Sequence, residues 1–502
     1  MNHALILPIL LPLFSGCLLL LGEQRLGSGG RRTLSLLATL ALLPLALWLT
    51  AEAHGGPLQV YALGNWVAPF GIVLVLDRLS ALMLLVTAAL ALFALCYAVR
   101  GDDERGRSFH ALFQFQLMGI NGAFLTGDLF NLFVFFEVLL IASYALLLHG
   151  GGGERVRAGL HYVVLNLVGS SLFLIALGLF YGIAGTLNMA DLARKVAQAS
   201  PDQAPLLGAA GLLLLLVFGL KAAMLPLYFW LPRAYAAASA PVAALFAIMT
   251  KVGVYAILRV FILVFGAQAG LLTDLAQVWL WPLALLTLLL GVLGALAASS
   301  LPLLLAYLVV VSVGTLLAGV ALGTPQALVA TLYYLMHSTW ITGGMFLLAD
   351  LVARQRGSKA ARLEAGPALL QPQLLAGLFF IGAIGIAGLP PLSGFFAKLM
   401  LLASVAPGMQ ALWLWSVVLL GSLGSLVALS RAGSTLFWRS GRVTLGCAES
   451  DNGRLLATIA LLALSPLLVL LAQPVTDYLE ATVDQLQAVE VYQMLILQGG
   501  VQ

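Results

Sequence analysis

Apolar runs of about 20 residues recur along the whole chain, separated by short stretches of polar residues, glycine or proline. The hydrocarbon core of a membrane is about 30 Å thick, so a helix of about 20 apolar residues crosses it. We therefore predict an all-α polytopic membrane protein with about 14 transmembrane helices, and boundaries accurate to about 2–4 residues. The spans lie near 4–22, 33–52, 72–99, 109–127, 129–149, 160–184, 206–231, 239–265, 275–298, 301–322, 327–352, 373–404, 410–432 and 454–473.

The composition agrees with a membrane protein and excludes a soluble one. Of the 502 residues, 62% are hydrophobic and 9% are charged, whereas soluble domains have about 25% charged residues. The run from Leu5 to Leu21 lacks a basic start and a small-residue cleavage site, so it is expected to be the first helix. Cys17, Cys96 and Cys447 match no metal, haem or redox spacing, which indicates packing roles. No phosphate loop, metal cluster or nucleophile constellation supports an enzyme.

The basic residues predict the orientation of the bundle. Of the 24 lysines and arginines, 17 lie in loops that follow odd-numbered spans, whereas the even-numbered loops contain only Arg194 and Lys195. Loops rich in Lys and Arg stay in the cytoplasm, so both termini are expected to face outward. The net charge of +4 does not indicate nucleic acid, because the basic residues are concentrated in loops that flank the membrane.

Two spans contain helix breakers near their middle. The seventh contains GLKAAMLPLYFWLP around Lys221, and the twelfth contains LPPLSGFFAKL around Lys398. Proline removes a backbone donor and clashes with the preceding turn, so both spans are expected to split. Broken helices at matching positions indicate an internal repeat, here two inverted five-helix units of spans 4–8 and 9–13. Two unrelated proline kinks are the alternative.

The repeat divides the chain into four regions. Residues 1–108 hold the first three helices, 109–265 the first repeat, 266–432 the second repeat, and 433–502 the last helix and a tail. After Pro474 the tail has four acidic and no basic residues, and its apolar residues recur at helical intervals. Such a tail is expected to be an amphipathic helix against a partner or the membrane interface, or else a solvated, frayed end.

Five ionisable residues lie inside the predicted spans. They are Glu137, Lys221, Lys251, His337 and Lys398. A charged side chain at the bilayer centre costs about 2.5–3.5 kcal/mol on insertion scales and normally faces a polar interior. Lysine buried beside a carboxylate can exchange a proton as the pair separates, and histidine titrates near neutrality. Together the five predict a path for protons. Hydroxyl groups are expected to anchor connecting water along it, namely those of Ser143, Ser170, Ser171, Thr250, Ser312, Thr315, Ser338, Thr339 and Ser393.

Each of these residues also has a purely structural interpretation. Glu137 would then be an ion-pair partner that sets helix register, the lysines structural charges, and His337 a hydrogen-bonded packing residue. Other charged groups near span ends are expected to be interfacial, capping or snorkelling residues: Asp77, Arg78, Asp128, Arg259 and Asp350.

The chain resembles a known family in these same segments. GLKAAMLPLYFWLPRAYAAASAPVAALFAIMTKVGVYAILR, which begins at Gly219, is similar to the antiporter-like membrane subunits shared by respiratory complex I and the multisubunit Mrp cation/proton antiporters. TGDLFNLFVFFEVLLIASYALL at Thr126 resembles the D subunit of the Mrp antiporter more than the complex I subunits. LDRLSALM at Leu76 and IAGLPPLSGFFAKL at Ile386 agree, so the resemblance covers spans 3 to 13.

The resemblance implies roles for the buried charges. Glu137 matches the essential glutamate of the family's fifth helix, and Lys221 matches the lysine that pairs with it. Lys251 matches the central relay lysine, and Lys398 matches the terminal lysine. His337 matches the residue that links the two halves. It implies a hetero-oligomer with the A, B, C, E, F and G subunits of the Mrp antiporter in a bacterial inner membrane, without cofactors or bound metal. That complex exchanges cytoplasmic Na⁺ (or K⁺ or Li⁺) for external protons.

Three functions remain open at this point. The first is a proton-translocating subunit of a monovalent cation/proton antiporter. The second is a proton-pumping membrane subunit of a redox complex, such as complex I or a membrane-bound hydrogenase. The third is a structural scaffold around a paralogue, which the complete set of buried charges disfavours. The cation is not identified, because no acidic cluster suggests a sodium site.

Overall fold

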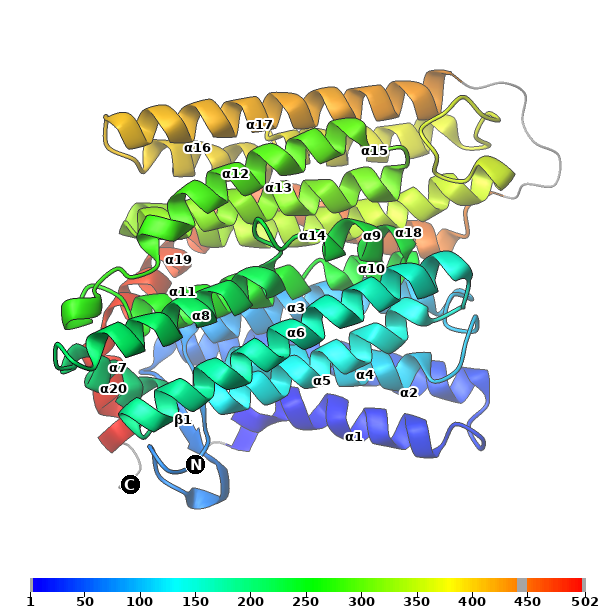
Figure 1. The fold of residues 1–502 in the computed structure, drawn as a ribbon. Coiled ribbons are helices and arrows are strands. Elements are labelled where there is room, and N and C mark those ends of the chain that lie inside the picture. Colours follow the sequence, from blue (N-terminus) through cyan, green and yellow to red (C-terminus); the bar gives the residue numbers. More distant parts are fainter. Residues whose placement is uncertain (1–2, 440–448, 499–502) are drawn as a thin grey trace.

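The protein is described here from a computed structural model that covers residues 3–439 and 449–498. The chain forms a bundle of long, roughly parallel helices (Figure 1). The helices are α1 (Leu7–Leu21), α2 (Ser28–Gly55), α3 (Arg78–Ala98), α4 (Phe109–Leu125), α5 (Leu129–Leu148), α6 (Gly153–Ala184), α7 (Met189–Ala197), α8 (Ala204–Ala222), α9 (Trp230–Ala237), α10 (Ala240–Phe246), α11 (Met249–Leu263), α12 (Gln277–Ala297), α13 (Leu301–Leu322), α14 (Pro325–Gln355), α15 (Pro372–Ala387), α16 (Ser393–Ala403), α17 (Met409–Gly433), α18 (Asn452–Leu470), α19 (Ala472–Gln487) and α20 (Val489–Gln498). Cys447, predicted to be a packing residue, lies outside the described residues.

Twelve helices in the described ranges are long and apolar enough to cross a membrane, some of them in combination with an adjoining short helix. Two of the predicted spans do not reach that length. The predicted span 109–127 is α4, which has 17 residues, and the predicted span 373–404 consists of the two shorter helices α15 and α16. The protein is therefore a multi-pass helical membrane protein, as the apolar runs predict, and the count of 14 remains a prediction.

The buried helices lie in the middle of the bundle. Nearly every residue of α11, α13 and α14 is buried, whereas α1, α6, α12 and α17 expose large apolar side chains. In Figure 1, α12 and α17 flank one side of this middle layer, and α1 and α2 flank the other. Exposed apolar surface suits a helix that contacts lipid, and full burial suits one that contacts only other helices.

A small sheet precedes the third long helix and was not predicted. Strands β1 (Gln59–Ala62) and β2 (Val73–Leu76) pair antiparallel, with Gln59 opposite Leu76. The predicted start of this span at residue 72 is therefore wrong. The helix begins at Arg78 because the Asp77 side chain accepts a hydrogen bond from the backbone N–H of Ser80 and caps it. Buried β-branched strand residues resemble the apolar start of a helix in sequence.

The C-terminal tail is helical, as its spacing predicts, but it packs against its own chain. α19 contacts α3, α11 and α14, and α20 lies beside α7 (Figure 1). Leu479 and Val483 are fully buried in this contact. The Tyr478 hydroxyl donates to the carbonyl of Arg78 at 2.9 Å. The apolar face that suggested a partner or the membrane interface is therefore covered by the bundle.

Candidate functional site

Glu137 and Lys221 are joined through a hydroxyl group and form no direct ion pair. Glu137 lies on α5 and accepts a hydrogen bond from Ser170 on α6. Lys221, near the end of α8, donates to Ser170 Oγ at 3.3 Å and to the backbone carbonyl of Asn166 at 3.3 Å. Lys221 is buried and Glu137 is half-buried. Because a hydroxyl both donates and accepts, Ser170 links the two charged groups.

The break that follows Lys221 is stabilised by hydrogen bonds from outside α8. Ala223 adopts a left-handed conformation with φ of 64° and ends the helix. Trp230 donates its indole N–H to the carbonyl of Leu220 at 3.0 Å, and Thr287 on α12 accepts from the Leu225 N–H at 2.9 Å. Backbone groups freed at membrane depth need such partners. The predicted break at the seventh span is therefore confirmed and is held by side chains from α9 and α12.

Lys251 lies just after a second interruption, which was not predicted. The expected continuous span 239–265 is divided into α10 and α11, and the Lys251 N–H bonds three residues back, to Ile248. This tightened turn is typical of a 3₁₀ segment, which often marks a functional hinge. The Lys251 side chain is fully buried and donates to Ser312 on α13 at 3.4 Å.

The backbones of α8 and α11 approach closely beside the two lysines. A Cβ at Gly253 would lie 2.5 Å from the backbone nitrogen of Ala222, so only glycine fits there. The neighbouring Thr250 hydroxyl is buried without a hydrogen-bond partner. Buried polar groups in such positions normally bind ordered water.

Unlike the three lysines, His337 lies on a long uninterrupted helix with no break beside it. It lies in the middle of α14, is buried, and its Nδ1 is 2.7 Å from Ser393 Oγ at the start of α16. Ser393 is in turn 2.8 Å from Ser465 Oγ on α18. The ring therefore ends a short chain of hydroxyl groups that crosses three helices.

Lys398 binds the backbone at the break between α15 and α16. Its ammonium group donates to the carbonyls of Ile386 at 3.1 Å and Ala387 at 3.0 Å, and to Ser422 Oγ on α17 at 2.9 Å. Gly388 ends α15 with φ of 79°, and a Cβ there would lie 2.7 Å from Lys398 Cδ. The predicted break in the twelfth span is confirmed, and the carbonyls that it frees receive the ammonium group.

The five residues share one arrangement. In the described part of the chain, no hydrogen bond or ion pair directly joins any two of them, and each contacts a hydroxyl group. A hydroxyl can pass a proton because it both accepts and donates. Within the described ranges no group of three or more His, Cys, Asp or Glu is placed to hold a metal ion.

Several contacting residues were not predicted from sequence. The serines at 170, 312 and 393 were expected to anchor water, and they bind the charged groups themselves. Asn166, Ser422 and Ser465 were missed. Asn166 and Ser422 each interrupt an apolar helix, a signal that exists in sequence but that many harmless serines and asparagines share. Which helix faces them depends on packing.

A buried ion pair near the start of α3 was also missed. Asp77 and Arg259 were predicted to be interfacial and snorkelling residues, but both are buried, with Arg259 Nη2 2.9 Å from Asp77 Oδ1. The Arg259 guanidinium lies over the rings of Tyr255 on α11 and Tyr492 on α20. The prediction was wrong because a residue near a span end becomes buried when other elements, here β2 and α20, cover that end.

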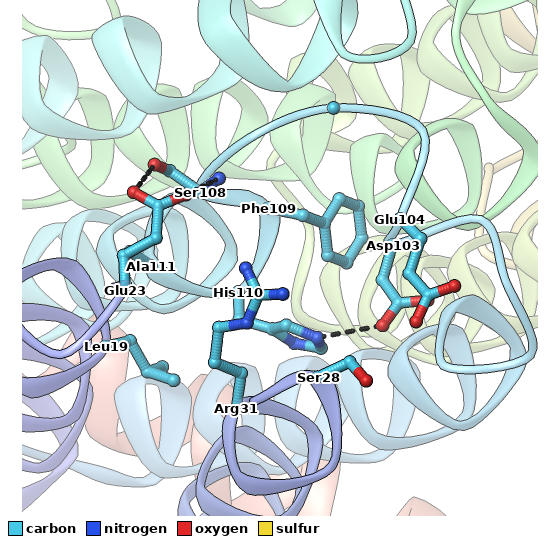
Figure 2. Close-up of a pocket in the computed structure, with 11 residues that line it drawn as sticks. Leu19, Glu23, Ser28, Arg31, Asp103, Glu104, Ser108, Phe109, His110 and Ala111 are labelled. Carbon is cyan, nitrogen blue, oxygen red and sulfur yellow. Dashed lines mark hydrogen bonds and ion pairs between the residues drawn. The ribbon is translucent and has the colours of Figure 1, made fainter. Parts of the chain in front are cut away.

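The opposite end of the bundle has its own network, in the loop before α4. Figure 2 shows Asp103 accepting a hydrogen bond from His110 beside a cavity of about 20 Å³. Arg32 on α2 binds both Asp103, at 2.6 Å, and Glu104, at 2.9 Å. Burial of Asp103 opposes its ionisation, but the hydrogen bonds and charges of His110 and Arg32 outweigh it and lower its pKa. This network ties α2 to the start of α4.

Comparison with known proteins identifies the class of this membrane protein. Residues 126–426 match the family described as "NADH:quinone oxidoreductase/Mrp antiporter, TM". The chain is 44% identical to the D subunit of a probable K⁺/H⁺ antiporter of Rhizobium meliloti, over 97% of this chain and 96% of that protein. It is 42% identical to the D subunit of a Na⁺/H⁺ antiporter of Bacillus subtilis, over 86% and 85% of the two chains.

Solved structures agree with this family assignment. A chain of the Mrp complex from Dietzia matches with a TM-score of 0.87 and 27% identity, over 99% of this chain and all of that one. A chain of an archaeal membrane-bound sulfane sulfur reductase matches with a TM-score of 0.88 and 25% identity, over the same shares. The interrupted helices and buried charges thus define an antiporter-like membrane subunit. The chain belongs to the NADH:quinone oxidoreductase/Mrp antiporter family, as a subunit of the D type.

Proposed function

We propose that this protein is the proton-translocating subunit of a multisubunit monovalent cation/proton antiporter. Protons move inward along a lateral chain of Glu137, Lys221, Lys251, His337 and Lys398, and the complex uses this flow to expel Na⁺, or K⁺ or Li⁺. The observation that carries the proposal is the Glu137–Ser170–Lys221 contact. An acid and a base that share one hydroxyl can exchange a proton when small movements change their separation.

The surroundings of the other lysines support the same mechanism. Lys221 and Lys398 lie beside the breaks that follow α8 and α15, and Lys251 lies beside the interruption between α10 and α11. Interrupted helices provide backbone carbonyls and room for water at membrane depth. The ammonium of Lys398 uses two such carbonyls. A lysine side chain held in this way can gain and lose a proton without leaving a buried polar group that lacks a hydrogen-bond partner.

The architecture that we propose follows the sequence interpretation. About 14 helices cross a bacterial inner membrane with both termini outside. Residues 109–265 and 266–432 form two inverted repeats that follow the first three helices (1–108), and 433–502 hold the last helix and the tail. The partners are the A, B, C, E, F and G subunits of the same antiporter. The names of the relatives support a multisubunit assembly and leave K⁺ and Na⁺ open as substrates.

The test is antiport in everted vesicles from a transporter-deficient host that expresses the full operon. Proton exchange for Na⁺, K⁺ and Li⁺ is compared under an imposed pH gradient. Glu137→Gln is expected to abolish exchange with every cation. The matched control Glu480→Gln changes an exposed acid on α19 and is expected to leave it unchanged. Undiminished exchange by the Glu137 variant in an assembled complex would exclude the proposed proton path.

The alternative is a proton-pumping subunit of a redox complex. It is supported by the likeness to the sulfane sulfur reductase chain, because the fold serves both classes. The same vesicles distinguish the two. Cation exchange driven by the imposed gradient without an electron donor supports the antiporter. Proton movement that occurs only when a donor is oxidised supports the redox complex.

A further inference from the structure

A groove of about 410 Å³ lies at the end of the bundle where basic residues concentrate, away from the five buried charges. It is lined by residues from the start of α6, from α9 and from the start of α13, including Arg157, Arg233 and Ser300. We propose that this groove binds the phosphate headgroup of an anionic glycerophospholipid. The proposal requires only that the protein lies in a membrane, and it does not depend on the transport mechanism.

Two unpaired arginines from different helices face the groove. Arg157 on α6 and Arg233 on α9 are exposed, and neither has a hydrogen-bond or ion-pair partner in the described part of the chain. Glu154 is the only acidic residue in the lining, among the described residues. Guanidinium groups bind phosphate oxygens with two parallel hydrogen bonds. Two such groups on one concave surface therefore suit a phosphate, and their charge exceeds that of the carboxylate.

The walls of the groove are held in place. Arg155 donates from Nε to the carbonyl of Ala237 at 2.9 Å and from Nη1 to the carbonyl of His149, so the start of α6 is fastened to the end of α9. Alanines at 158, 236 and 237 leave the space between the arginines open. The groove is thus a formed part of the bundle in which Arg157 and Arg233 cannot drift far apart.

The surface of α6 next to the groove is apolar and therefore suits contact with acyl chains and not with water. Along the outward face of α6 below Arg157, Leu160, Val164 and Leu167 are 66%, 50% and 60% exposed. Apolar side chains exposed at helical intervals on a membrane protein contact lipid. A ligand in this groove therefore meets cationic groups at one end and an apolar face at the other. A phospholipid has both parts, whereas an acidic protein loop or free phosphate has only the first.

The direct test measures bound lipid on the complex purified from cells that express the full operon. Native mass spectrometry with added phosphatidylglycerol is expected to show one tightly bound lipid, whose affinity falls about 10- to 30-fold in Arg157→Gln/Arg233→Gln, as expected for the loss of two membrane-proximal arginines. The control Arg25→Gln/Arg107→Gln removes two other exposed arginines, which have no hydrogen-bond or ion-pair partner among the described residues, and is expected to retain that lipid. Phosphatidylcholine and inorganic phosphate are expected not to compete.

Three results would overturn the proposal. Equal loss of lipid from both double variants would mean that net charge alone attracts phosphatidylglycerol. Displacement of the lipid by inorganic phosphate would mean that the groove recognises a soluble anion. Loss of a subunit from the groove variant, while the control complex stays intact, would mean that the arginines bind a protein partner.

Discussion

Lys398 Nζ lies 2.9 Å from Ser422 Oγ, a contact that joins the second broken helix to α17. Ser422 is the only side chain that the ammonium group contacts in the described structure, since its other two partners are backbone carbonyls. Hydrogen bonds to charged groups contribute about 1.5–3 kcal/mol. Ser422 is therefore the side chain through which substitution can most directly disturb this lysine without removing its charge.

Ser422→Ala is expected to slow proton exchange roughly tenfold or more, because the ammonium loses a hydrogen bond of about that strength. The effect is measured from initial rates of proton exchange in everted vesicles. Within the described ranges, the Ser425 hydroxyl on the same helix bonds only to the carbonyl of Gly421, so Ser425→Ala is expected to exchange at the parental rate. Equal rates in the two variants would mean that Ser422 does not support Lys398.

Ser170→Ala is expected to uncouple Glu137 from Lys221. The variant keeps both charges but removes the only hydroxyl group that contacts both in the described structure, so we expect exchange to fall by roughly tenfold or more. The adjacent Ser171 is exposed and bonds to the carbonyl of Leu167, which makes Ser171→Ala a matched control. If Ser170→Ala transports normally, water or a direct contact must link the charges.

Gly253→Ala is expected to disturb the approach of α11 to the break after α8. Its new Cβ would lie 2.5 Å from the Ala222 nitrogen, so the helices must separate and Lys221 must move relative to Lys251. Overpacking typically costs about 1–3 kcal/mol of stability. We therefore expect the purified variant complex to have a lower melting temperature and slower proton exchange than the parent. A Cβ added at Gly178 on α6 would meet no described atom within 4 Å, so Gly178→Ala is expected to change neither quantity.

The Asp103 network predicts a pH-dependent stability. The pKa of the Asp103 carboxyl is lowered, which means that folding favours its ionised form. The contribution of ionised Asp103 to the stability of the fold is therefore complete above the unfolded-state pKa of about 3.9. This contribution is lost as pH falls through the lower folded-state pKa. Asp103→Asn is expected to destabilise by about 1–3 kcal/mol at pH 7. Melting temperatures from pH 7 to about 3.5 should show the difference from the parent begin to shrink only below about pH 4.

The control for that experiment is Glu104→Gln. Glu104 also binds Arg32 but is half-exposed, and exposed ion pairs contribute about 0–1 kcal/mol. Its melting temperature is therefore expected to stay close to that of the parent at every pH. A constant difference between Asp103→Asn and the parent across the whole range would contradict the role of ionised Asp103.

The buried Asp77–Arg259 pair predicts a strong energetic coupling. Removing one partner leaves an uncompensated buried charge, which costs about 3–5 kcal/mol, so Arg259→Met and Asp77→Leu should each lower the melting temperature strongly. The double variant is expected to be more stable than either single variant, because it buries no unpaired charge. Additive losses in this double-mutant cycle would show that the two residues act independently.

Much of the fold could be predicted because membrane insertion is a local property of the chain. The apolar runs marked the long helices, and the prolines near Lys221 and Lys398 marked two breaks that the structure contains. The interruption before Lys251 was not predictable, since the residues around it, ALFAIMT at 244–250, contain no glycine or proline. The strand Val73–Leu76 was mistaken for the start of a helix, because a short apolar run does not distinguish the two.

By itself, the sequence determined that this is a multi-pass membrane protein and that two helices break near prolines. It also placed Glu137, Lys221, Lys251, His337 and Lys398 inside the bundle, although it missed the buried Asp77–Arg259 pair. These features follow from the free-energy cost of placing charges and unpaired backbone groups in hydrocarbon. That cost depends on the residues of each segment and not on its neighbours in the fold. Only the tertiary structure decided the contacts of those residues: Ser170 between Glu137 and Lys221, Ser393 against His337, and the freed carbonyls around Lys398. Such contacts depend on which helix faces join, and the pattern along one helix does not specify its neighbour.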